Sequence, residues 1–521
     1  MPSSHAAARD LEDRLHRLND IGMALSAERD LNVLLERIVQ EARRFTRADA
    51  GSLYLVHEDR LEFQVAQNDS LKSFVGGRRG QTGVPPVPLD RSSVSGYVAV
   101  TGETLNIADV YTDRRYRFEG PQQYDRISGY RTRSMLVVPM RDHEHEILGV
   151  LQLINALDPD TGKVQGFTDQ DESLIQSLAS QAAVAINNVR LVRDTEALFE
   201  AFVQVMATAI DERSPYTGGH IRRVAEVTMI LARAVNACNQ GPLAGIRFTE
   251  SELDELRVAA WMHDIGKITT PEWVVDKATK LSARFDRIEL LRTRYACIRE
   301  ATERELLQRQ LDGENPDKLA AERRQRLQQL EADLEFLERA NRPGEFMEDA
   351  DVERLQEIAA QRYTAGGREY PRLTPDELAH LSIRKGSLTE SERKIINDHA
   401  VVTIRMLEQI PFTRKLSRVS EIAGSHHEKL DGSGYPQGLR ADQISLQARI
   451  LALVDVFESL SAADRPYKKG MSPETVLRIL EEEVQANHLD GQLLELLVNQ
   501  RLFRCLEDIK ERMRNQQKNT V

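Results

Sequence analysis

The chain has 521 residues, with 82 Asp and Glu against 70 Lys and Arg, and its formal net charge at pH 7 is −12. This length predicts two or more domains. The negative charge argues against nucleic acid or an anionic membrane surface as partner, although a local metal pocket can still bind a dianionic nucleotide. The three cysteines lack metal-finger spacing and no long apolar segment or signal core is present. We therefore expect reduced thiols, a cytoplasmic location and no membrane segment.

The first part of the chain predicts an α+β domain. Apolar residues recur with helical spacing from 15 to 45, which indicates an opening pair of helices. Two pairs of strands follow, separated by a helix that enters a glycine turn, and this order of elements is typical of an α+β fold. The strands are predicted at 52–56, 61–65, 135–140 and 147–155, and the helix at 92–104.

Residues 15–192 resemble a GAF domain, a small-molecule sensor fold, in the segments LNIADV, RSMLVVPM, ILGVLQLIN and FTDQDE. Asn155, Phe167, Asp171 and Glu172 approximate a signature of the cyclic-nucleotide-binding members. Ala156 replaces the basic residue of that signature. Two interpretations stay open: a GAF domain that binds a small ligand, and a GAF fold used only for dimerisation.

A long connecting helix is predicted over residues 171–212, because no proline or glycine interrupts this stretch. We expect it to pack against its copy in a parallel homodimer. A ligand of the sensor domain could then influence the following domain only by changing how this helix packs. The apolar residues assigned to this helix are Leu174, Leu178, Ala182, Ala185, Val189, Val192, Phe199, Phe202 and Met206.

Histidines and carboxylates occur at predicted helices and helix ends of the second half. A helix should begin near His220, an apolar helix over 256–262 ends at His263 and Asp264, and His399 lies in a helical pattern over 395–407. A lone histidine of this kind is more often structural than a ligand.

Further candidates follow in the segment HHEKLDGSGYP, which begins with His426 and His427 and contains Tyr435, and Asp455 lies in a later apolar helical run. We expect a helix to end in this segment, so that the two adjacent imidazoles serve different metals. Imidazoles combined with carboxylates favour a mid-row divalent transition metal over calcium or magnesium.

Residues 196–510 resemble the HD-GYP phosphodiesterases, a branch of the HD superfamily, apart from one insertion. The matching motifs are SPYTGGHIRRV, HDIGKI, HHEKLDGSGYP and LVDVFESLSAADRPYKK, together with the helix that carries His399. The resemblance implies an all-helical domain that hydrolyses cyclic di-GMP to pGpG or GMP at a centre of two divalent metals, iron or manganese. The metal ligands that it implies are His220, His263, Asp264, His399, His426, His427 and Asp455.

The chemistry agrees with this resemblance. Two metals about 3.5–4 Å apart can activate water and neutralise charge on phosphoryl oxygens. Asp264 is the natural bridging carboxylate, and Lys267, about one helical turn beyond His263, could place an ammonium on a phosphate oxygen. The resemblance adds Arg465 and Lys468, which would hold the second phosphate or a guanine edge, and Tyr435 would shape the rim of the site.

Some family members bind a third metal through a carboxylate one turn before the first ligand histidine. Tyr216 occupies that position here, which favours a two-metal centre. We interpret the nearby Asp211 and Glu212 as charges at the N-terminus of a helix.

Residues 282–385 form an insertion within this domain. They separate two halves of a turn, at 276–281 and 384–389, that resembles the family's Lys-Pro-Gly-x-Leu turn. Helical repeats on both sides of 312–316 predict an antiparallel helical hairpin with a solvated, charged face. A partner-binding arm and a lid over the metal site are two hypotheses for its role.

These observations favour a metal-dependent cyclic di-GMP phosphodiesterase regulated by a GAF sensor. One alternative is hydrolysis of another cyclic dinucleotide, such as cyclic GMP-AMP. Another is a non-catalytic module that binds cyclic di-GMP or a diguanylate-cyclase partner. The intact ligand set argues against the non-catalytic alternative, since a degenerate site should have lost at least one ligand.

Overall fold

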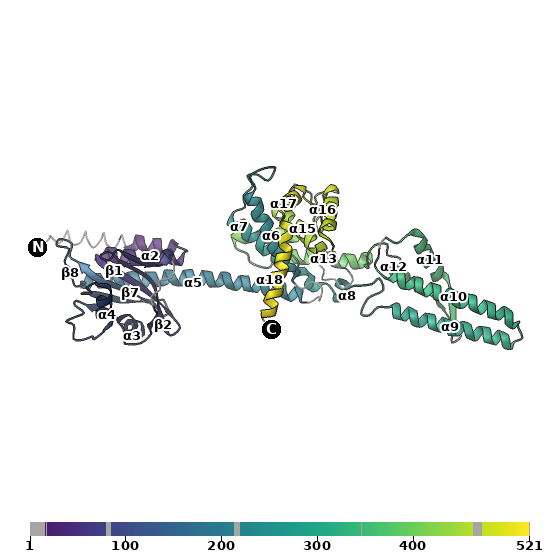
Figure 1. The fold of residues 1–521 in the computed structure, drawn as a ribbon, viewed down its shortest axis with the longest axis horizontal. Coiled ribbons are helices and arrows are strands. Elements are labelled where there is room, and N and C mark those ends of the chain that lie inside the picture. Colours follow the sequence, from purple (N-terminus) through teal and green to yellow (C-terminus); the bar gives the residue numbers. More distant parts are fainter. Residues whose placement is uncertain are drawn as a thin grey trace. The chain divides into compact units, whose positions relative to one another are not determined.

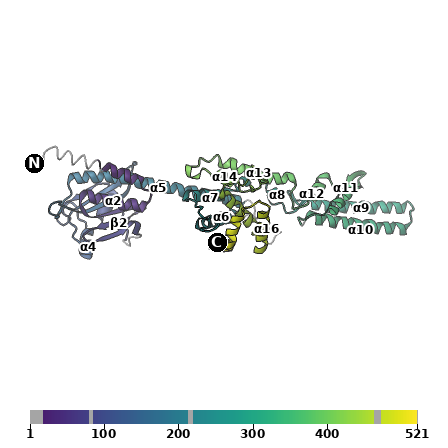
Figure 2. The ribbon, with the colours of Figure 1, turned by 90° about the horizontal axis from the view of Figure 1, so that it is seen from above.

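The computed structural model describes residues 16, 18–79, 85–212, 219–344, 346–461 and 471–519 (Figures 1 and 2). The chain divides into two compact units, 1–199 and 200–521. Tyr216, Arg465 and Lys468 lie outside the described residues. Among the helices that are described, none has the length and apolar character needed to span a membrane.

An antiparallel sheet forms the centre of the first unit. Its strands are β1 (Ala48–His57), β2 (Arg60–Asn68), β3 (Ser73–Gly76), β4 (Val87–Pro88), β5 (Leu105–Ile107), β6 (Met135–Arg141), β7 (Ile147–Leu157) and β8 (Val164–Gln165). The spatial order is β3-β2-β1-β7-β6-β5, while β4 pairs with β2 and β8 with β7. Leu53 of β1 lies opposite Leu151 of β7, and both side chains are buried. The predicted α+β fold is confirmed, with four short strands that the sequence pattern did not reveal.

Helices cover both faces of this sheet (Figure 1). They are α2 (Leu31–Thr46), α3 (Val94–Thr101), α4 (Gly120–Ser128) and α5 (Asp169–Asp211), with a short 3-10 helix η1 (Gly77–Arg79). Residues of α2 and α5 share one apolar core with the sheet, and residues of α3 contribute to a second. The predicted glycine turn is Gly102, which ends α3 with a φ of 68°.

The helix α5 is continuous over the stretch in which a connecting helix was expected. Its first part, however, buries Leu174, Leu178, Ala182 and Ala185 in the core of the first unit. These four residues therefore cannot face a second copy, and their assignment to a dimer interface is wrong.

A different set of apolar side chains on α5 is exposed. Val184, Leu191, Leu198 and Val205 follow one another at intervals of seven residues and are 43, 53, 72 and 65% exposed. Such spacing places them along one side of the helix, as in a coiled coil. We call these four residues the α5 stripe.

The second unit is helical outside its insertion. Its elements are α6 (His220–Ala237), α7 (Glu250–Met262), η2 (Ile265–Thr269), α8 (Glu272–Val275), α13 (Glu390–Leu407), η3 (Arg414–Leu416), α14 (Val419–Gly424), α15 (Leu446–Ser461), α16 (Pro473–Gln485), α17 (Gly491–Asn499), η4 (Leu502–Arg504) and α18 (Cys505–Asn519). Capping boxes begin α7 at Thr249 and α13 at Thr389, so both helices have fixed starting points.

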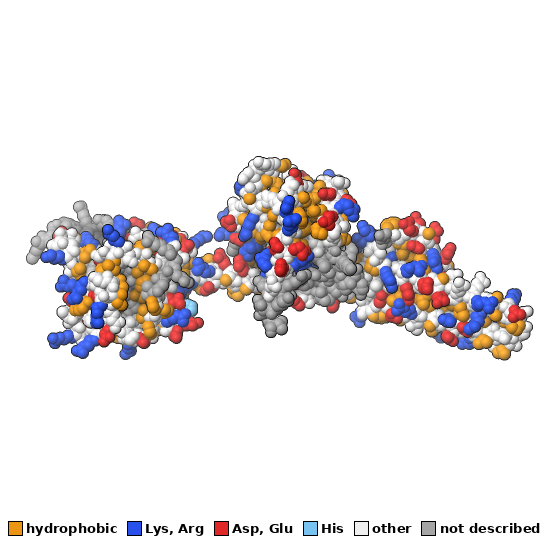
Figure 3. Space-filling model, in the orientation of Figure 1, with side chains coloured by type: hydrophobic (Ala, Val, Ile, Leu, Met, Phe, Trp, Pro, Cys, Tyr) orange, Lys and Arg blue, Asp and Glu red, His pale blue; other side chains and the backbone are white. Residues whose placement is uncertain are grey.

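The insertion has its own apolar core. It comprises α9 (Ile288–Leu311), α10 (Pro316–Asn341), α11 (Asp349–Ala360), β9 (Arg362–Ala365), β10 (Arg368–Pro371) and α12 (Pro375–Leu381). The predicted hairpin of α9 and α10 is confirmed, and both views show the two helices side by side (Figures 1 and 2). Acidic and basic side chains are interspersed on its surface (Figure 3), as expected for a solvated face. The β9–β10 hairpin was not expected.

Gly266 permits the close packing of η2 against α13. A Cβ atom at this position would lie 2.0 Å from the carbonyl oxygen of His399 and 2.7 Å from the amide nitrogen of Thr403. The Gly266 amide also donates to Thr403 Oγ1 at 3.0 Å. Only a residue without a side chain fits here, and this contact brings the start of η2 next to the middle of α13.

Substitution Gly266→Ala should therefore destabilise the second unit by about 1–3 kcal/mol, because backbone atoms must move apart to admit the methyl group. Both tryptophans, Trp261 and Trp273, lie in this unit, so urea unfolding followed by tryptophan fluorescence measures the effect. Gly344→Ala is the matched control, since a Cβ there meets nothing within 4 Å. Equal unfolding midpoints for the two variants would contradict the packing argument.

Candidate metal centre

Five segments of the second unit bring the predicted ligands together. His220 begins α6, His263 and Asp264 follow α7, His399 lies within α13, His426 and His427 follow α14, and Asp455 lies within α15. Three groups have ligand atoms within 4.8 Å of one another. They are His220, His263 and Asp455; His263, Asp264 and His426; and His399, His426 and His427.

Asp264 lies between two sets of histidines. Its Oδ2 atom is 3.7 Å from His220 Nε2 and 3.4 Å from His263 Nε2. Its Oδ1 atom is 3.4 Å from His399 Nε2 and 3.9 Å from His426 Nε2. Donor atoms that share one transition metal at about 2.0–2.2 Å lie at comparable mutual distances. Each oxygen of this carboxylate can therefore serve a different cation.

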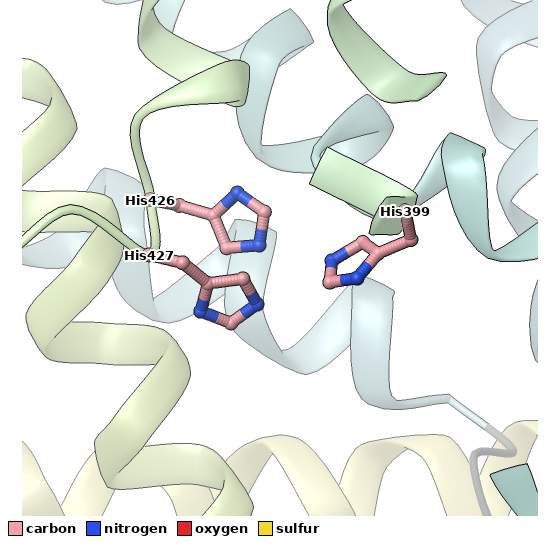
Figure 4. Close-up of side chains that lie close together, drawn as sticks. All are labelled: His399, His426 and His427. Carbon is pink, nitrogen blue, oxygen red and sulfur yellow. The ribbon is translucent and has the colours of Figure 1, made fainter. Parts of the chain in front are cut away.

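Asp455 completes the side of the site that contains His220. Its Oδ1 atom lies 3.3 Å from His220 Nε2 and 3.9 Å from His263 Nε2. On the other side, the ring of His399 faces the adjacent pair His426 and His427 (Figure 4). The ring centroids of that pair are 3.9 Å apart. The helix before them ends at Gly424, earlier than expected, so the pair is not constrained by helical geometry.

Three of the histidines are oriented by main-chain carbonyl groups. The Nδ1 atoms of His263, His399 and His426 lie 2.8, 2.5 and 2.6 Å from the carbonyl oxygens of residues 260, 396 and 423. A carbonyl oxygen only accepts, so each Nδ1 donates its proton. The Nε2 atom of each ring is then left with a lone pair for a metal.

His220 is oriented by a carboxylate that the sequence analysis missed. Its Nδ1 atom donates to Glu458 Oε2, and the other oxygen of Glu458 accepts from Arg223 Nε. Glu458 is fully buried and Arg223 is 5% exposed. Glu458 lies three residues after Asp455, on the same face of α15, and that spacing is the signal that could have identified it.

The site satisfies a physical test for a cation. Within the described part of the chain, His263 Nε2, His399 Nε2, His426 Nε2 and Asp264 Oδ1 are buried without a hydrogen-bonding partner. Such atoms are rare in folded proteins because losing water without replacement is costly. A divalent metal would satisfy them together, and the mixed nitrogen and oxygen donors suit a transition metal.

The protonation states differ between the two sides of the site. Burial, together with the neighbouring imidazoles, holds the pKa of His426 well below its usual value, and burial lowers that of His427 to about 4. Burial favours protonation of Asp264, but Lys267 and His263 outweigh it, so that its pKa falls well below the ordinary value. Contacts with Asp455 and Glu458 likewise outweigh the burial of His220 and raise its pKa to about 10. Neutral imidazoles at His426 and His427 and an ionised Asp264 are thus available. Burial disfavours protonation of His263, but Asp264 and Asp455 outweigh it and raise the pKa of His263 as well, so metal binding would displace protons from His220 and His263.

Lys267 and Tyr435 lie at the edge of the ligand set. Lys267 Nζ is 2.6 Å from Asp264 Oδ2, and its side chain is 29% exposed. The Tyr435 ring lies 4.8 Å from the His427 ring. Glu428 holds the Tyr435 loop by accepting from the amides of Gln437 and Leu439 at 2.7 and 2.9 Å. A cationic and an aromatic group therefore border the site.

Asp211 has a different position from the one expected. It is the last residue of α5, not a residue of a helix N-terminus, and the earlier interpretation is wrong. Its carboxylate accepts from the amide of Ile221 at 3.3 Å and so connects the end of α5 to the start of α6. Burial raises its pKa to about 6.

The four candidate ligand residues of the first unit are engaged within that unit. Asn155 accepts from the amides of Arg133 and Ser134 and donates to Tyr130 Oη and the Arg131 carbonyl. Phe167 is part of the apolar core. Asp171 accepts from Thr168, and Glu172 from Asn106. These contacts give all four residues a structural role.

Comparison with known families agrees with both units. The GAF domain family matches residues 30–186, and two HD domain profiles match residues 217–337 and 348–493. The matches cover the sheet of the first unit and the ligand-bearing helices of the second.

Curated relatives share parts of the chain. The 3'3'-cGAMP-specific phosphodiesterase 1 of Vibrio cholerae is 42% identical over 24% of this chain and 27% of its own length. The 3'3'-cGAMP-specific phosphodiesterase 2 of the same organism is 24% identical over 65% of this chain and 41% of its own. The dual 3',5'-cyclic-AMP and -GMP phosphodiesterase 11A of Takifugu rubripes is 33% identical over 32% of this chain and 18% of its own.

The chain thus spans less than half the length of each of these relatives. The family matches nevertheless cover both units, in the order in which the motifs occur. The chain carries a GAF domain followed by a domain of the HD superfamily.

Proposed function

We propose that the HD domain is a metal-dependent phosphodiesterase of the HD-GYP type that hydrolyses cyclic di-GMP to pGpG or GMP. The observation that carries this proposal is the position of Asp264, whose two oxygens face separate sets of histidines. His220, His263 and Asp455 would hold one metal, and His399, His426 and His427 the other. We favour iron or manganese, because the donors are imidazoles and carboxylates without thiolates.

Bound metals would supply activated water and neutralise charge on the phosphoryl group. The side chains of the protein would orient the metals and the substrate and supply positive charge near the phosphate. Asp264, held as a carboxylate by Lys267, is fixed in direction by its position between the two histidine sets. The partly exposed Lys267 ammonium can turn from Asp264 towards a phosphate oxygen, and Tyr435 can contact a ribose or a base. Arg465 and Lys468 are proposed to hold the second phosphate.

A second candidate substrate is 3'3'-cyclic GMP-AMP. Three relatives from Vibrio cholerae are named for that substrate, and two of them share 42% identity with this chain over their matched segments. Both substrates contain two phosphodiester bonds, so the metal chemistry is the same, and the base-contacting residues would decide between them. A non-catalytic sensor is disfavoured, because all seven proposed ligands are present and close together.

The GAF domain is proposed to regulate this activity through a homodimer in which two α5 helices pack in parallel. The α5 stripe supports the dimer, since four exposed apolar residues at seven-residue intervals match a coiled-coil seam. A small ligand of the GAF domain could shift the equilibrium between packing arrangements of this seam.

Purified full-length protein reconstituted anaerobically with iron or manganese should hydrolyse cyclic di-GMP, with products separated by chromatography. Asp264→Ala should lower the rate about a hundredfold or more, because it removes the shared carboxylate. Asp254→Ala is the control, an exposed residue of α7, the helix that precedes Asp264. Parallel assays with 3'3'-cyclic GMP-AMP decide between the two substrates. Undiminished hydrolysis by Asp264→Ala would refute the proposed centre.

Glu458→Gln should weaken metal binding about 10–100-fold, because His220 loses the carboxylate that orients it. Metal content per chain after dialysis against a graded chelator series measures this effect without relying on turnover. Glu495→Gln, an exposed substitution on α17, is the matched control. Equal metal retention by both variants would show that Glu458 does not position the ligand.

The double substitution Leu191→Glu and Leu198→Glu should convert the dimer to monomer, because it places four like charges in the seam. Sedimentation velocity at micromolar concentration gives the mass directly. Arg193→Glu, on the opposite side of α5, should remain dimeric. If the unsubstituted chain sediments as a monomer, the α5 stripe does not form a stable dimer interface.

A further inference from the structure

A small cavity of about 180 Å³ lies where the insertion meets the HD domain. Lys280, just before the insertion, and Arg384, at its end, both line it. Arg339 and Arg342, at the end of α10, line it as well, and Asp351 is the carboxylate among its described lining residues. Four cations and one anion therefore surround this space, which we call the anchor cavity.

Lys280 forms the buried part of the anchor cavity. The residue is 3% exposed. Its Nζ atom donates to the Leu381 carbonyl oxygen at 3.0 Å and lies 3.9 Å from Met347 Sδ. No carboxylate of the described residues lies within ion-pair distance of this ammonium. Burial lowers its pKa to about 8, so the group is still mainly cationic at neutral pH.

The arginines form the exposed part of the cavity. Arg384 is paired with Asp349 at 2.5 Å and lies over the ring of Phe346. Arg339 and Arg342 make no ion pair with any carboxylate that the structure describes. Three cations of the anchor cavity thus form no ion pair with a described carboxylate, although Asp351 lines the same cavity.

The negative ends of two helices balance part of the positive charge of the anchor cavity, but not all of it. Leu381 ends α12 and Asn341 ends α10, and the carboxyl end of a helix carries a partial negative charge of about half an elementary charge. Two such ends contribute about one negative charge and Asp351 contributes one more, against the three positive charges of Lys280, Arg339 and Arg342. The cavity therefore keeps an excess of positive charge that a bound anion could balance.

We propose that the anchor cavity binds a phosphate group. Phosphate offers several acceptor oxygens and close to two negative charges, and guanidinium groups bind it through paired hydrogen bonds. The volume corresponds to about six waters at about 30 Å³ each, enough for a phosphate but not for a whole nucleotide. The phosphate is either free inorganic phosphate or the phosphate of a nucleotide whose remainder stays in solvent.

A phosphate at this position would connect both ends of the insertion. Lys280 belongs to the segment that enters the insertion and Arg384 to the segment that leaves it, and the amide of Met347 already donates to the Arg384 carbonyl at 3.0 Å. Bound phosphate would therefore fix the insertion to the HD domain. This inference does not depend on the proposed phosphodiesterase activity.

The test is calorimetric titration of metal-loaded full-length protein with inorganic phosphate and, separately, with guanosine 5'-monophosphate. Lys280→Met and the double substitution Arg339→Gln and Arg342→Gln should each weaken one binding event about tenfold or more, because charge-assisted hydrogen bonds are lost. Arg324→Gln, also on α10 but outside the cavity, should bind like the unsubstituted chain. Phosphate can also bind at the metal centre, but this binding is the same in all variants and so does not contribute to the difference between them.

Binding of phosphate alone would identify the free ion as ligand, and binding of both would identify a nucleotide phosphate as an acceptable source. Identical titrations for all variants would overturn the proposal. The cationic side chains would then serve only to interact with the negative ends of the helices. The two arginines are exposed, so their substitution tests the site even if Lys280→Met does not fold.

Discussion

The burial of imidazole nitrogens around one carboxylate is the constraint on which the helical unit depends. Four ligand atoms lie there without a hydrogen-bonding partner in the described chain, and each such atom costs about 1–3 kcal/mol. Five separate segments contribute the ligands, so a bound cation would add a further connection among them. Metal binding and folding of this unit are therefore linked, because a cation that binds only the folded site stabilises it.

Orientation of the rings follows from where each histidine lies. His263, His399 and His426 each follow helical residues, so a carbonyl oxygen three positions earlier is available to Nδ1. His220 is the first residue of α6 and has no preceding turn of that helix, so Glu458 from α15 supplies the oxygen instead. Arg223 then balances the buried charge of Glu458. The difference between the four rings is thus a consequence of helix boundaries.

Sequence motifs predicted both fold classes, the helix ends at His220 and Met262, and the helical hairpin, because caps, glycines and apolar spacing are local signals. Contacts between distant segments left no such signal. The role of Glu458 could not be predicted because it depends on α15 lying next to α6 in the fold. Some apolar residues of α5 pack in the core of the first unit and others form the exposed α5 stripe, and apolar spacing alone does not distinguish the two groups. Likewise, the approximate ligand signature of the GAF domain was read from residue types, whereas Asn155 proves to be engaged by main-chain groups.

The insertion is attached to a helix that also carries a proposed ligand. Lys277, just before the insertion, forms a buried ion pair with Glu392 in the first turn of α13, at 2.7 Å, and His399 lies two turns further along the same helix. Ser387, just after the insertion, donates to the Lys277 carbonyl at 2.9 Å. Removing one partner of a buried ion pair costs about 3–5 kcal/mol, because the other charge is left buried and uncompensated. The segments on both sides of the insertion are therefore joined to each other and, through Lys277, to the helix that carries His399.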